Sequence, residues 1–219
     1  MPVSTSSVVP RTGGVEAYIA AKTAVPATPP NGTVNVSRNS AGKPTRIDVN
    51  ADGVTNDYVI DISYDSAGRV TRIDFNANGV TADVIDDFSY NSAGLVTRHD
   101  HNADGVTNDW IDDFSYDSAG HLTRYDHNAN GVTADVVEDF SYDSAGRITR
   151  FDHNADGVTS DLVEDFSYDS AGRVTHWTYN ANGSTSDASL DVSYDSGGNV
   201  SNLTSNGAKA SGATVKKCN

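Results

Sequence analysis

The stretch "DHNADGVTNDWIDDFSYDSAGHLTRYDHNANGVTAD", residues 100–135, contains nearly the same sequence twice. The repetition extends in both directions. Tyrosines recur every 26 residues, at Tyr64, Tyr90, Tyr116, Tyr142, Tyr168 and Tyr194. A fixed period in this range is typical of repeat architectures, in which each unit buries its apolar side chains only against its neighbours. The units before Tyr64 and after Tyr194 diverge, as expected of capping units.

Each repeat predicts two β-strands. "RVTRIDF" (69–75) and "DVIDDFSY" (83–90) are rich in β-branched and aromatic residues that alternate with polar ones. The turns "NANGVTA" and "DSAG" join them alternately. We therefore predict an all-β fold, in which tandem 26-residue β-hairpin repeats form an elongated, twisted antiparallel meander of about twelve strands, similar to a solenoid. The predicted domains are an N-terminal arm or linker (1–33), the repeat domain (34–204) and a C-terminal tail (205–219).

Residue types also predict a register for the hairpins. If Asp74 faces Val84, then Arg72 faces Asp86, which gives a cross-strand ion pair. The same offset pairs the arginines of the next three repeats with acids and leaves the two end repeats without one. The further predicted pairs are Arg98 with Asp112, Arg124 with Glu138, Arg150 with Glu164, Arg46 with Ile60 and His176 with Leu190.

The composition is acidic and only moderately apolar. The chain has 30 acidic and 15 basic residues, a formal net charge of −15, and 37% hydrophobic residues. This charge argues against nucleic acid and anionic membranes as partners and favours bound cations. No apolar stretch is long enough to span a membrane, and the first residues lack the pattern of a secretory signal. Cys218 is the single cysteine, so no intrachain disulfide is expected.

The longer turn carries more oxygen-bearing side chains than a turn requires. Its pattern is D-x-N-x-(D/N)-G-x-x-x-D, with oxygens at positions 1, 3, 5 and 10 and glycine at position 6. Calcium binds six to eight oxygens from carboxylates, amides and backbone carbonyls. We therefore predict about five calcium ions, one in each complete loop. The predicted ligands are Asp48, Asn50, Asp52 and Asp57; Asp74, Asn76, Asn78 and Asp83; Asp100, Asn102, Asp104 and Asp109; Asp126, Asn128, Asn130 and Asp135; and Asp152, Asn154, Asp156 and Asp161.

A bare turn is the alternative to calcium. Asn-Gly and Asp-Gly are strong hairpin-turn signals, which accounts for positions 5 and 6 but not for the acids at positions 1 and 10. The loop is not an EF-hand, because position 12 is apolar in every complete copy and no helices flank it. A sixth copy has Thr178 at position 1 and keeps only Asp187, so we expect it to bind calcium weakly or not at all.

The shorter turn belongs to a second motif. "FSYDSAGRI", from Phe140 to Ile148, resembles the YD repeat of the RHS family, whose pattern is roughly Y-x-Y-D-x-x-G-R-L. The resemblance covers about residues 36–200. It implies a long, spiralling β-sheet of the kind found in toxin-enclosing shells and in cell-surface proteins. The chain is too short to close such a shell by itself, so the resemblance favours a structural or surface role.

The repeated acids argue against an enzyme, because a catalytic pair needs one distinctive environment. We expect a non-enzymatic, calcium-stabilised structural protein outside the cell or on its surface, as a matrix, adhesion or filament subunit. It would assemble with itself through sheet edges or the N-terminal arm. The alternative is a carbohydrate-binding module that holds matrix or cell-surface glycans on the sheet face with His99, Tyr125, Phe151 and Trp177. The histidines at loop position 2 (His101, His127 and His153) are expected to point away from the ion.

Overall fold

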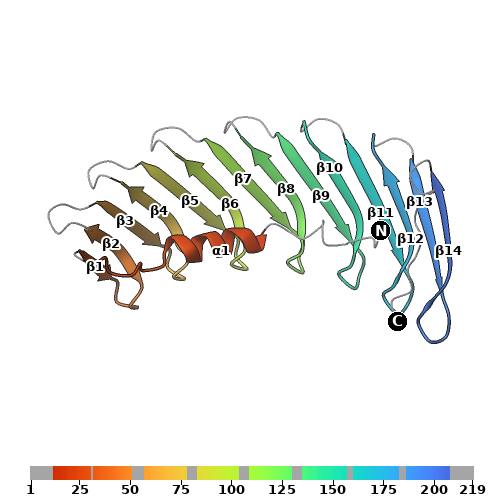
Figure 1. Cartoon of the computed structure of the whole chain (residues 1–219), viewed down its shortest axis with the longest axis horizontal. Coiled ribbons are helices and arrows are strands. Elements are labelled where there is room, and N and C mark those ends of the chain that lie inside the picture. Colours follow the sequence, from red (N-terminus) through yellow and green to blue (C-terminus); the bar gives the residue numbers. More distant parts are fainter. Residues whose placement is uncertain are drawn as a thin grey trace. The chain divides into compact units, whose positions relative to one another are not determined.

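Fourteen strands follow one another in chain order and form one antiparallel sheet in the computed structural model (Figure 1). The all-β antiparallel meander is therefore confirmed, with two strands more than expected. The structure describes residues 12–30, 32–50, 57–77, 83–103, 109–129, 135–156, 160–182 and 186–207. The elements are α1 (Thr12–Lys22), β1 (Thr33–Arg38), β2 (Pro44–Asn50), β3 (Tyr58–Tyr64), β4 (Val70–Asn76), β5 (Val84–Tyr90), β6 (Val96–Asn102), β7 (Trp110–Tyr116), β8 (Leu122–Asn128), β9 (Val136–Tyr142), β10 (Ile148–Asn154), β11 (Leu162–Tyr168), β12 (Val174–Asn180), β13 (Ala188–Tyr194) and β14 (Val200–Gly207).

The chain divides into two compact units. Of the described residues, those within 12–114 and 127–129 form the first, here called the α1 unit, and those within 115–126 and 135–207 form the second, the C-terminal unit. Both contain the same kind of hairpin. The outermost strands are β1, which begins at Thr33, and β14, which ends at Gly207. Cys218 lies outside the described residues.

Alternation along each strand gives the sheet two different faces. In the β4–β5 hairpin, Ile73 lies opposite Asp86 and Phe75 opposite Val84, whereas Arg72 lies opposite Asp87. The face of Ile73, here called the core face, carries most of the buried apolar side chains, because successive side chains of a strand point to opposite sides. Its buried members include Ile47, Ile62, Ile73, Phe88 and Phe114 in the α1 unit and Phe140 and Phe166 in the C-terminal unit.

The opposite face, here called the polar face, carries arginine and aspartate. It also buries one aliphatic side chain per repeat close to the longer loop, at loop position 12. These residues are Val59, Ile85, Ile111, Val137 and Val163, each at most 9% exposed. Position 12, where an EF-hand would carry a metal-binding glutamate, is therefore a packing position in this chain.

The predicted register is wrong by one residue. Arg72 pairs with Asp87, not with Asp86, and Asp74 pairs with Ile85, not with Val84. A one-residue slip moves every side chain of a strand to the other face, so Asp86 lies on the core face. Each strand after a longer loop carries two adjacent acids in the middle repeats, so an acid faces the arginine in either register. This is why residue types alone did not distinguish the two.

With the corrected register, the row of cross-strand contacts to aspartate also includes the first and the last of the longer hairpins. Arg46 contacts Asp61 at 2.8 Å, and His176 contacts Asp191 at 2.7 Å, where apolar partners had been predicted. The pairs in the middle repeats are Arg72–Asp87 (2.8 Å), Arg98–Asp113 (3.0 Å), Arg124–Asp139 (2.9 Å) and Arg150–Asp165 (3.0 Å). The predicted partners Asp112, Glu138 and Glu164 lie one residue earlier, on the core face.

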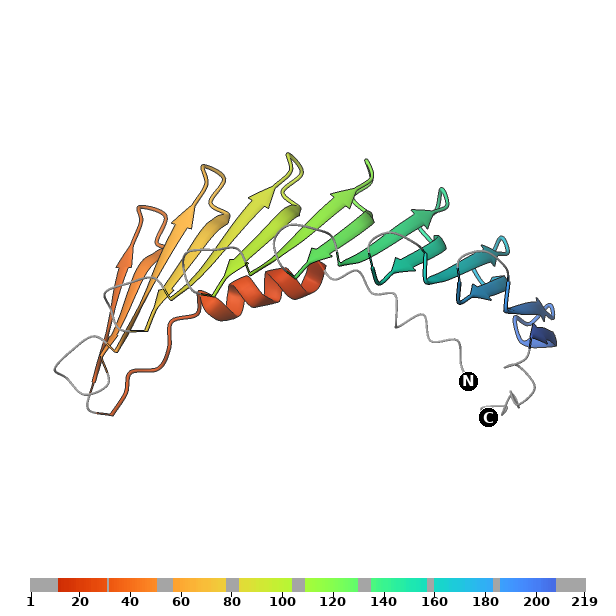
Figure 2. The same ribbon diagram turned by 90° about the horizontal axis from the view of Figure 1, so that it is seen from above.

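Helix α1 lies on the core face of the α1 unit, as Figures 1 and 2 show. Val15 of this helix is buried, and the Tyr18 hydroxyl donates a hydrogen bond to Asp86 Oδ2 at 2.7 Å. The predicted arm therefore contributes a helix that covers a sheet face, while β1 takes the edge position. No helix in the part of the chain that the structure describes is long and apolar enough to cross a membrane.

Candidate metal-binding loops

Loop positions 1 and 3 lie on the polar face, at the end of the strand that leads into each longer loop. The position-1 aspartate stands beside the arginine two residues earlier on the same strand. The distances are 3.0 Å for Arg46–Asp48, 4.0 Å for Arg72–Asp74, 3.7 Å for Arg98–Asp100, 3.0 Å for Arg124–Asp126 and 3.5 Å for Arg150–Asp152. Each arginine therefore contacts two carboxylates, one along its strand and one across the hairpin.

Loop position 10 closes the longer hairpin. The backbone N–H of Asp83 donates to the carbonyl of Phe75 at 2.9 Å, and the Asp83 carboxylate accepts the N–H of Ala77 at 2.6 Å. The same carboxylate bond recurs from Ala103 to Asp109, from Ala155 to Asp161 at 2.7 Å and from Ala181 to Asp187 at 2.7 Å. Position 10 thus has a structural role in the sixth copy as well, where calcium was not expected.

The sequence interpretation missed these two roles. According to that interpretation, a bare turn leaves the acids at positions 1 and 10 unexplained. In the structure, the position-1 acid contacts an arginine and the position-10 acid accepts a backbone N–H, so both acids have a role without a metal ion. One signal was available. The sixth repeat loses the position-1 acid and the arginine together, as Thr178 and His176, but retains Asp187. The acid at position 10 therefore does not depend on the acid at position 1.

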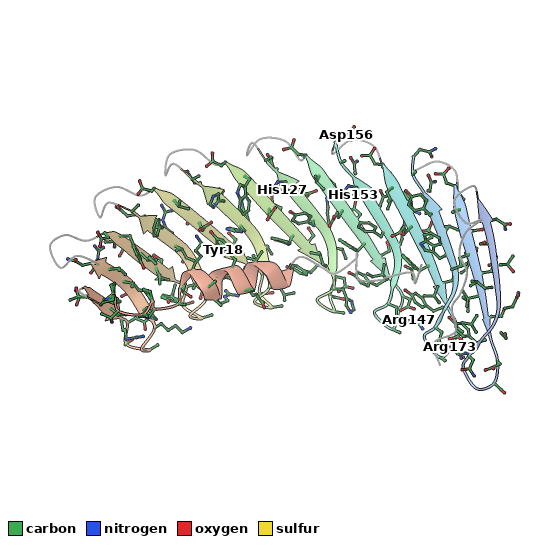
Figure 3. The ribbon with its side chains drawn as sticks, viewed as in Figure 1. Tyr18, His127, Arg147, His153, Asp156 and Arg173 are labelled. Carbon is green, nitrogen blue, oxygen red and sulfur yellow. The ribbon has the colours of Figure 1, made fainter. Side chains whose placement is uncertain are left out.

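The structure brings together only part of each predicted ligand set. Asp52, Asn78, Asp104 and Asn130, at position 5, lie outside the described residues, as does the glycine of position 6 in all five loops. In the fifth loop, the N–H of Asp156 donates to Asn154 Oδ1 at 3.2 Å. Figure 3 shows Asp156 at the strand ends that lead into the longer loops.

The polar face carries carboxylate oxygens that its own cations do not fully satisfy. Burial raises the pKa of Asp74 and Asp100 above its ordinary value, and the neighbouring carboxylate of Asp87 raises both further, against the opposing effect of Arg72 and Arg98. Asp126 Oδ1 is buried and has no hydrogen-bond partner among the described residues. Oxygens of this kind fit a hard divalent cation.

A second set of acids lies on the core face and pairs with histidine. The Nδ1 atoms of His101 and His127 lie 2.8 and 2.7 Å from Asp86 and Asp112, and His153 Nδ1 lies 3.6 Å from Glu138. Trp177 Nε1 donates to Glu164 at 3.1 Å. The histidines of loop position 2 thus point to the face opposite the position-1 aspartates, as expected. Their pairing with these acids was not anticipated, because it follows from the corrected register.

The predicted glycan-binding face is not an open surface. His99 and Tyr125 are each only 3% exposed, so neither offers a ring to a carbohydrate in this structure. Phe151 and Trp177 are half-buried. The interpretation of this face is therefore wrong for His99 and Tyr125. Strand alternation predicted the shared face correctly, but it did not show what covers it.

At the ends of the strands opposite the longer loops, the shorter turns connect successive repeats. The Tyr168 hydroxyl donates to the carbonyl of Ile148, 20 residues earlier, at 2.7 Å. Arg147 forms an ion pair with Asp143 at 2.6 Å, lies over the Tyr168 ring at 4.6 Å and donates to the carbonyl of Asp169 at 3.2 Å. Gly146 has φ +77°, which only glycine adopts readily. Figure 3 shows Arg147 and Arg173 at this edge.

Each residue type of the Y-D-x-x-G-R motif therefore has a contact role or a turn role, and the contacts reach the next repeat. The RHS repeat family matches residues 116–159 and, in a second overlapping window, residues 142–185. Residues 116–185 are thus similar to RHS repeats. In these repeats, tyrosine and arginine join neighbouring turns, while aspartate and glycine shape the turn itself. No protein with a curated function matches the chain.

One solved structure shares the sheet fold of this chain. A chain in the structure of the Photorhabdus luminescens Tc holotoxin pore matches with a TM-score of 0.54 at 19% identity, over 78% of this chain and 9% of that one. A TcdB2-TccC3-TEV crystal structure (TM-score 0.30, 14% identity, 81% and 12% covered) and a porin-like protein from Bacteroides uniformis (0.27, 12%, 80% and 88%) also match, at scores too low to support an argument. The chain thus shares its sheet architecture with a small part of the Tc pore chain.

Proposed function

We propose that this chain is a non-enzymatic structural segment of a larger secreted or cell-surface assembly, and that calcium stabilises its sheet. The observation that carries the structural role is the contact between successive turns. A tyrosine hydroxyl donates to a carbonyl 20 residues earlier in at least five of the described repeats, at 2.7–2.8 Å. The stability of a repeat array depends on the interfaces between its repeats. Contacts that link each repeat to its neighbour therefore support a structural role.

The two outer strands support assembly with other protein chains. Among the described strands, β1 pairs only with β2, and β14 pairs only with β13. Val200 of β14 is 51% exposed. An unpaired sheet edge is a template for strand addition. We propose that the partner is another β-sheet edge, from a second copy or from another subunit of the assembly.

Calcium stabilisation rests on the polar face. The described residues that would hold the ion are the position-1 aspartate, the position-3 asparagine and the second oxygen of the position-10 carboxylate. The free, buried oxygen of Asp126 and the raised pKa values of Asp74 and Asp100 support a cation there. Bound calcium would supply positive charge to a chain whose formal net charge is −15.

A calcium titration with two matched variants tests this part of the proposal. Asp109→Asn keeps an oxygen that accepts the Ala103 N–H but removes the charge, whereas Asp187→Asn makes the same change in the sixth loop, where Thr178 replaces the position-1 acid. We expect calorimetry to show about five sites in the parent chain, one fewer in Asp109→Asn and no loss in Asp187→Asn. The absence of heat with CaCl₂, together with unfolding that EGTA does not change, would contradict the calcium role.

Assembly through the sheet edge has its own test. Lysine on an edge strand opposes pairing with another strand. We expect sedimentation of the parent chain in calcium to shift to larger species as the concentration rises, and Val200→Lys to reduce that shift. Val25→Lys, at a 42% exposed position outside the sheet, is the matched control and should not. Monomers at every concentration, with calcium present and with a candidate partner subunit added, would contradict assembly.

A further inference from the structure

A buried cluster of metal-binding side chain types lies beneath α1. Asp86 is on β5, and His99 and His101 are on β6. His99 Nε2 lies 2.9 Å and His101 Nδ1 2.8 Å from the same carboxylate atom, Asp86 Oδ1, while the Tyr18 hydroxyl donates to Asp86 Oδ2 at 2.7 Å. Two imidazoles thus meet at one oxygen, and the helix holds the other oxygen.

Aromatic rings enclose this cluster. Phe88 stacks on His99 with 4.6 Å between ring centroids, and Trp110 stacks on His101 at 4.8 Å. Tyr18 lies 5.3 Å from His99. Asp86 and His99 are only 1% and 3% exposed, whereas the His101 side chain keeps 18%. The carboxylate is therefore shielded from bulk water, and His101 leaves one open side for an ion to enter.

The sequence builds this cluster in one repeat only. The position of His99 holds Ile73, Tyr125, Phe151 and Trp177 in the neighbouring repeats. His127 and His153 each meet an acid, as His101 does, but without a second imidazole on the same strand. Because residues two apart on a strand share a face, His99 and His101 both reach Asp86. The repeat in which histidine replaces the usual apolar or aromatic residue is therefore also the repeat that Tyr18 contacts.

We propose that Asp86, His99 and His101 form a binding site for a zinc-class divalent transition metal. The two imidazole nitrogens and the carboxylate oxygen lie within 4.8 Å of one another. In a four-coordinate zinc site, ligand atoms lie about 3.3 Å apart, as zinc–nitrogen bonds of about 2.0–2.1 Å require. To hold an ion between them, the two nitrogen–oxygen distances would lengthen from 2.9 and 2.8 Å toward this value. Water would complete the shell.

The ligand set selects against calcium. Imidazole binds zinc, cobalt, nickel and copper, whereas calcium prefers oxygen alone. This site is thus chemically distinct from the loops of the polar face. Tyr18 acts as a positioning residue, because its hydrogen bond orients the carboxylate from outside the metal shell. A metal here would link β5 to β6 and fix the carboxylate that α1 binds.

Cobalt titration of the full, untagged chain in excess calcium tests the site. We expect one equivalent of Co²⁺ to give the intense visible absorption of a four-coordinate N/O site, and Zn²⁺ to remove it. His99→Phe and His101→Phe copy the residues of neighbouring repeats, Phe151 and Phe75, and should abolish the band. His127→Phe, which leaves the cluster intact, should keep it. Tyr18→Phe should weaken binding by about tenfold or more and change the band shape.

A measurement on the parent chain keeps the test independent of how the variants fold. We expect zinc to shift the imidazole nitrogen resonances of His99 Nε2 and His101 Nδ1 before those of the other four histidines. Absence of the cobalt band in the parent chain would overturn the site. Equal loss in His127→Phe, or shifts spread evenly over all six histidines, would also overturn it.

Discussion

Within the shorter turns, the side chain of the first residue contacts the residue four positions later. Asp65, Asp143 and Asp169 each form an ion pair with arginine at the fourth following residue, at 2.6–2.7 Å. The third repeat has Asn91 and Leu95 instead, and Asn91 Oδ1 still accepts two backbone N–H groups at 3.0 Å. The turn therefore needs the side-chain oxygen, and the charge serves the arginine.

Acid should weaken this contact. The hydrogen bonds and ion pair from Arg147 hold the pKa of Asp143 below its usual value. A lowered pKa contributes stability above the ordinary carboxyl range, and this stability is lost as the pH falls through the pKa of the folded state. Asp143→Asn, which copies Asn91, should lower the urea midpoint slightly at pH 7 and leave it equal to that of the parent chain in acid. An equal loss at both pH values would contradict this account.

The glycine of the turn is a second constraint at the residue scale. Gly146 has φ +77°, and an added Cβ would lie 2.8 Å from His121 Nε2. Gly146→Ala should therefore lower the free energy of unfolding by about 1–2 kcal/mol. Gly14→Ala, in α1 with nothing within 4 Å of the added atom, should instead leave stability unchanged or raise it. Urea unfolding of both variants measures the contrast, and equal effects would contradict it.

At the scale of the strand, the register decides which face each side chain occupies. Ile73 and Arg72 are neighbours on β4, yet Ile73 is 2% exposed on the core face while the Arg72 side chain is 40% exposed on the polar face. Packing on the core face should therefore contribute more to the stability of the sheet than the ion pairs of the polar face, although the ion pairs recur in every middle repeat. Exposed ion pairs contribute little, because water and salt screen them.

Substitution of these neighbours should separate the two faces. Ile73→Ala removes buried methyl groups and should cost about 2–5 kcal/mol. Arg72→Met should cost about 1 kcal/mol or less, since its pair with Asp87 is exposed. Denaturant midpoints of the two variants give the comparison. A larger loss for Arg72→Met would show that the ionic row, and not the core face, holds the sheet together.

At the scale of the whole molecule, the repeats are joined by the sheet ladder and by the turn contacts. The tyrosine that defines the period is the same residue that reaches the preceding repeat. Loss of one such contact should therefore act mainly on its own neighbourhood, as in a linear array with nearest-neighbour coupling. Helix α1 is an exception to the periodicity, because it occurs once and its Tyr18 contacts Asp86 on β5 and His99 on β6.

Tyr168→Phe tests this local coupling. The change removes the bond to the Ile148 carbonyl and should cost about 0.5–1.5 kcal/mol. Amide hydrogen exchange should quicken in β10, β11 and β12, while β2, β3 and β4 keep the protection of the parent chain. Uniform loss of protection over the whole sheet would instead indicate a single cooperative unit.

The sequence by itself determined the class of fold, the period, the strand and turn positions and the RHS resemblance. These features follow from local chemistry: alternation, β-branching and the turn residues repeat with each unit. It also placed His101, His127 and His153 on the face opposite the loop aspartates, because alternation alone requires this. The loop oxygens were found in the same way, and their calcium chemistry stays a prediction.

Tertiary structure decided the register, the docking of α1 and the meeting of His99, His101 and Asp86. The register depended on which of two adjacent acids faces each arginine, and both choices satisfy the same local rules. Burial on the core face settled it, since a one-residue slip would exchange the apolar side chains for charged ones. The helix contact joins residues 68 positions apart, Tyr18 and Asp86, and no local pattern in either segment encodes it.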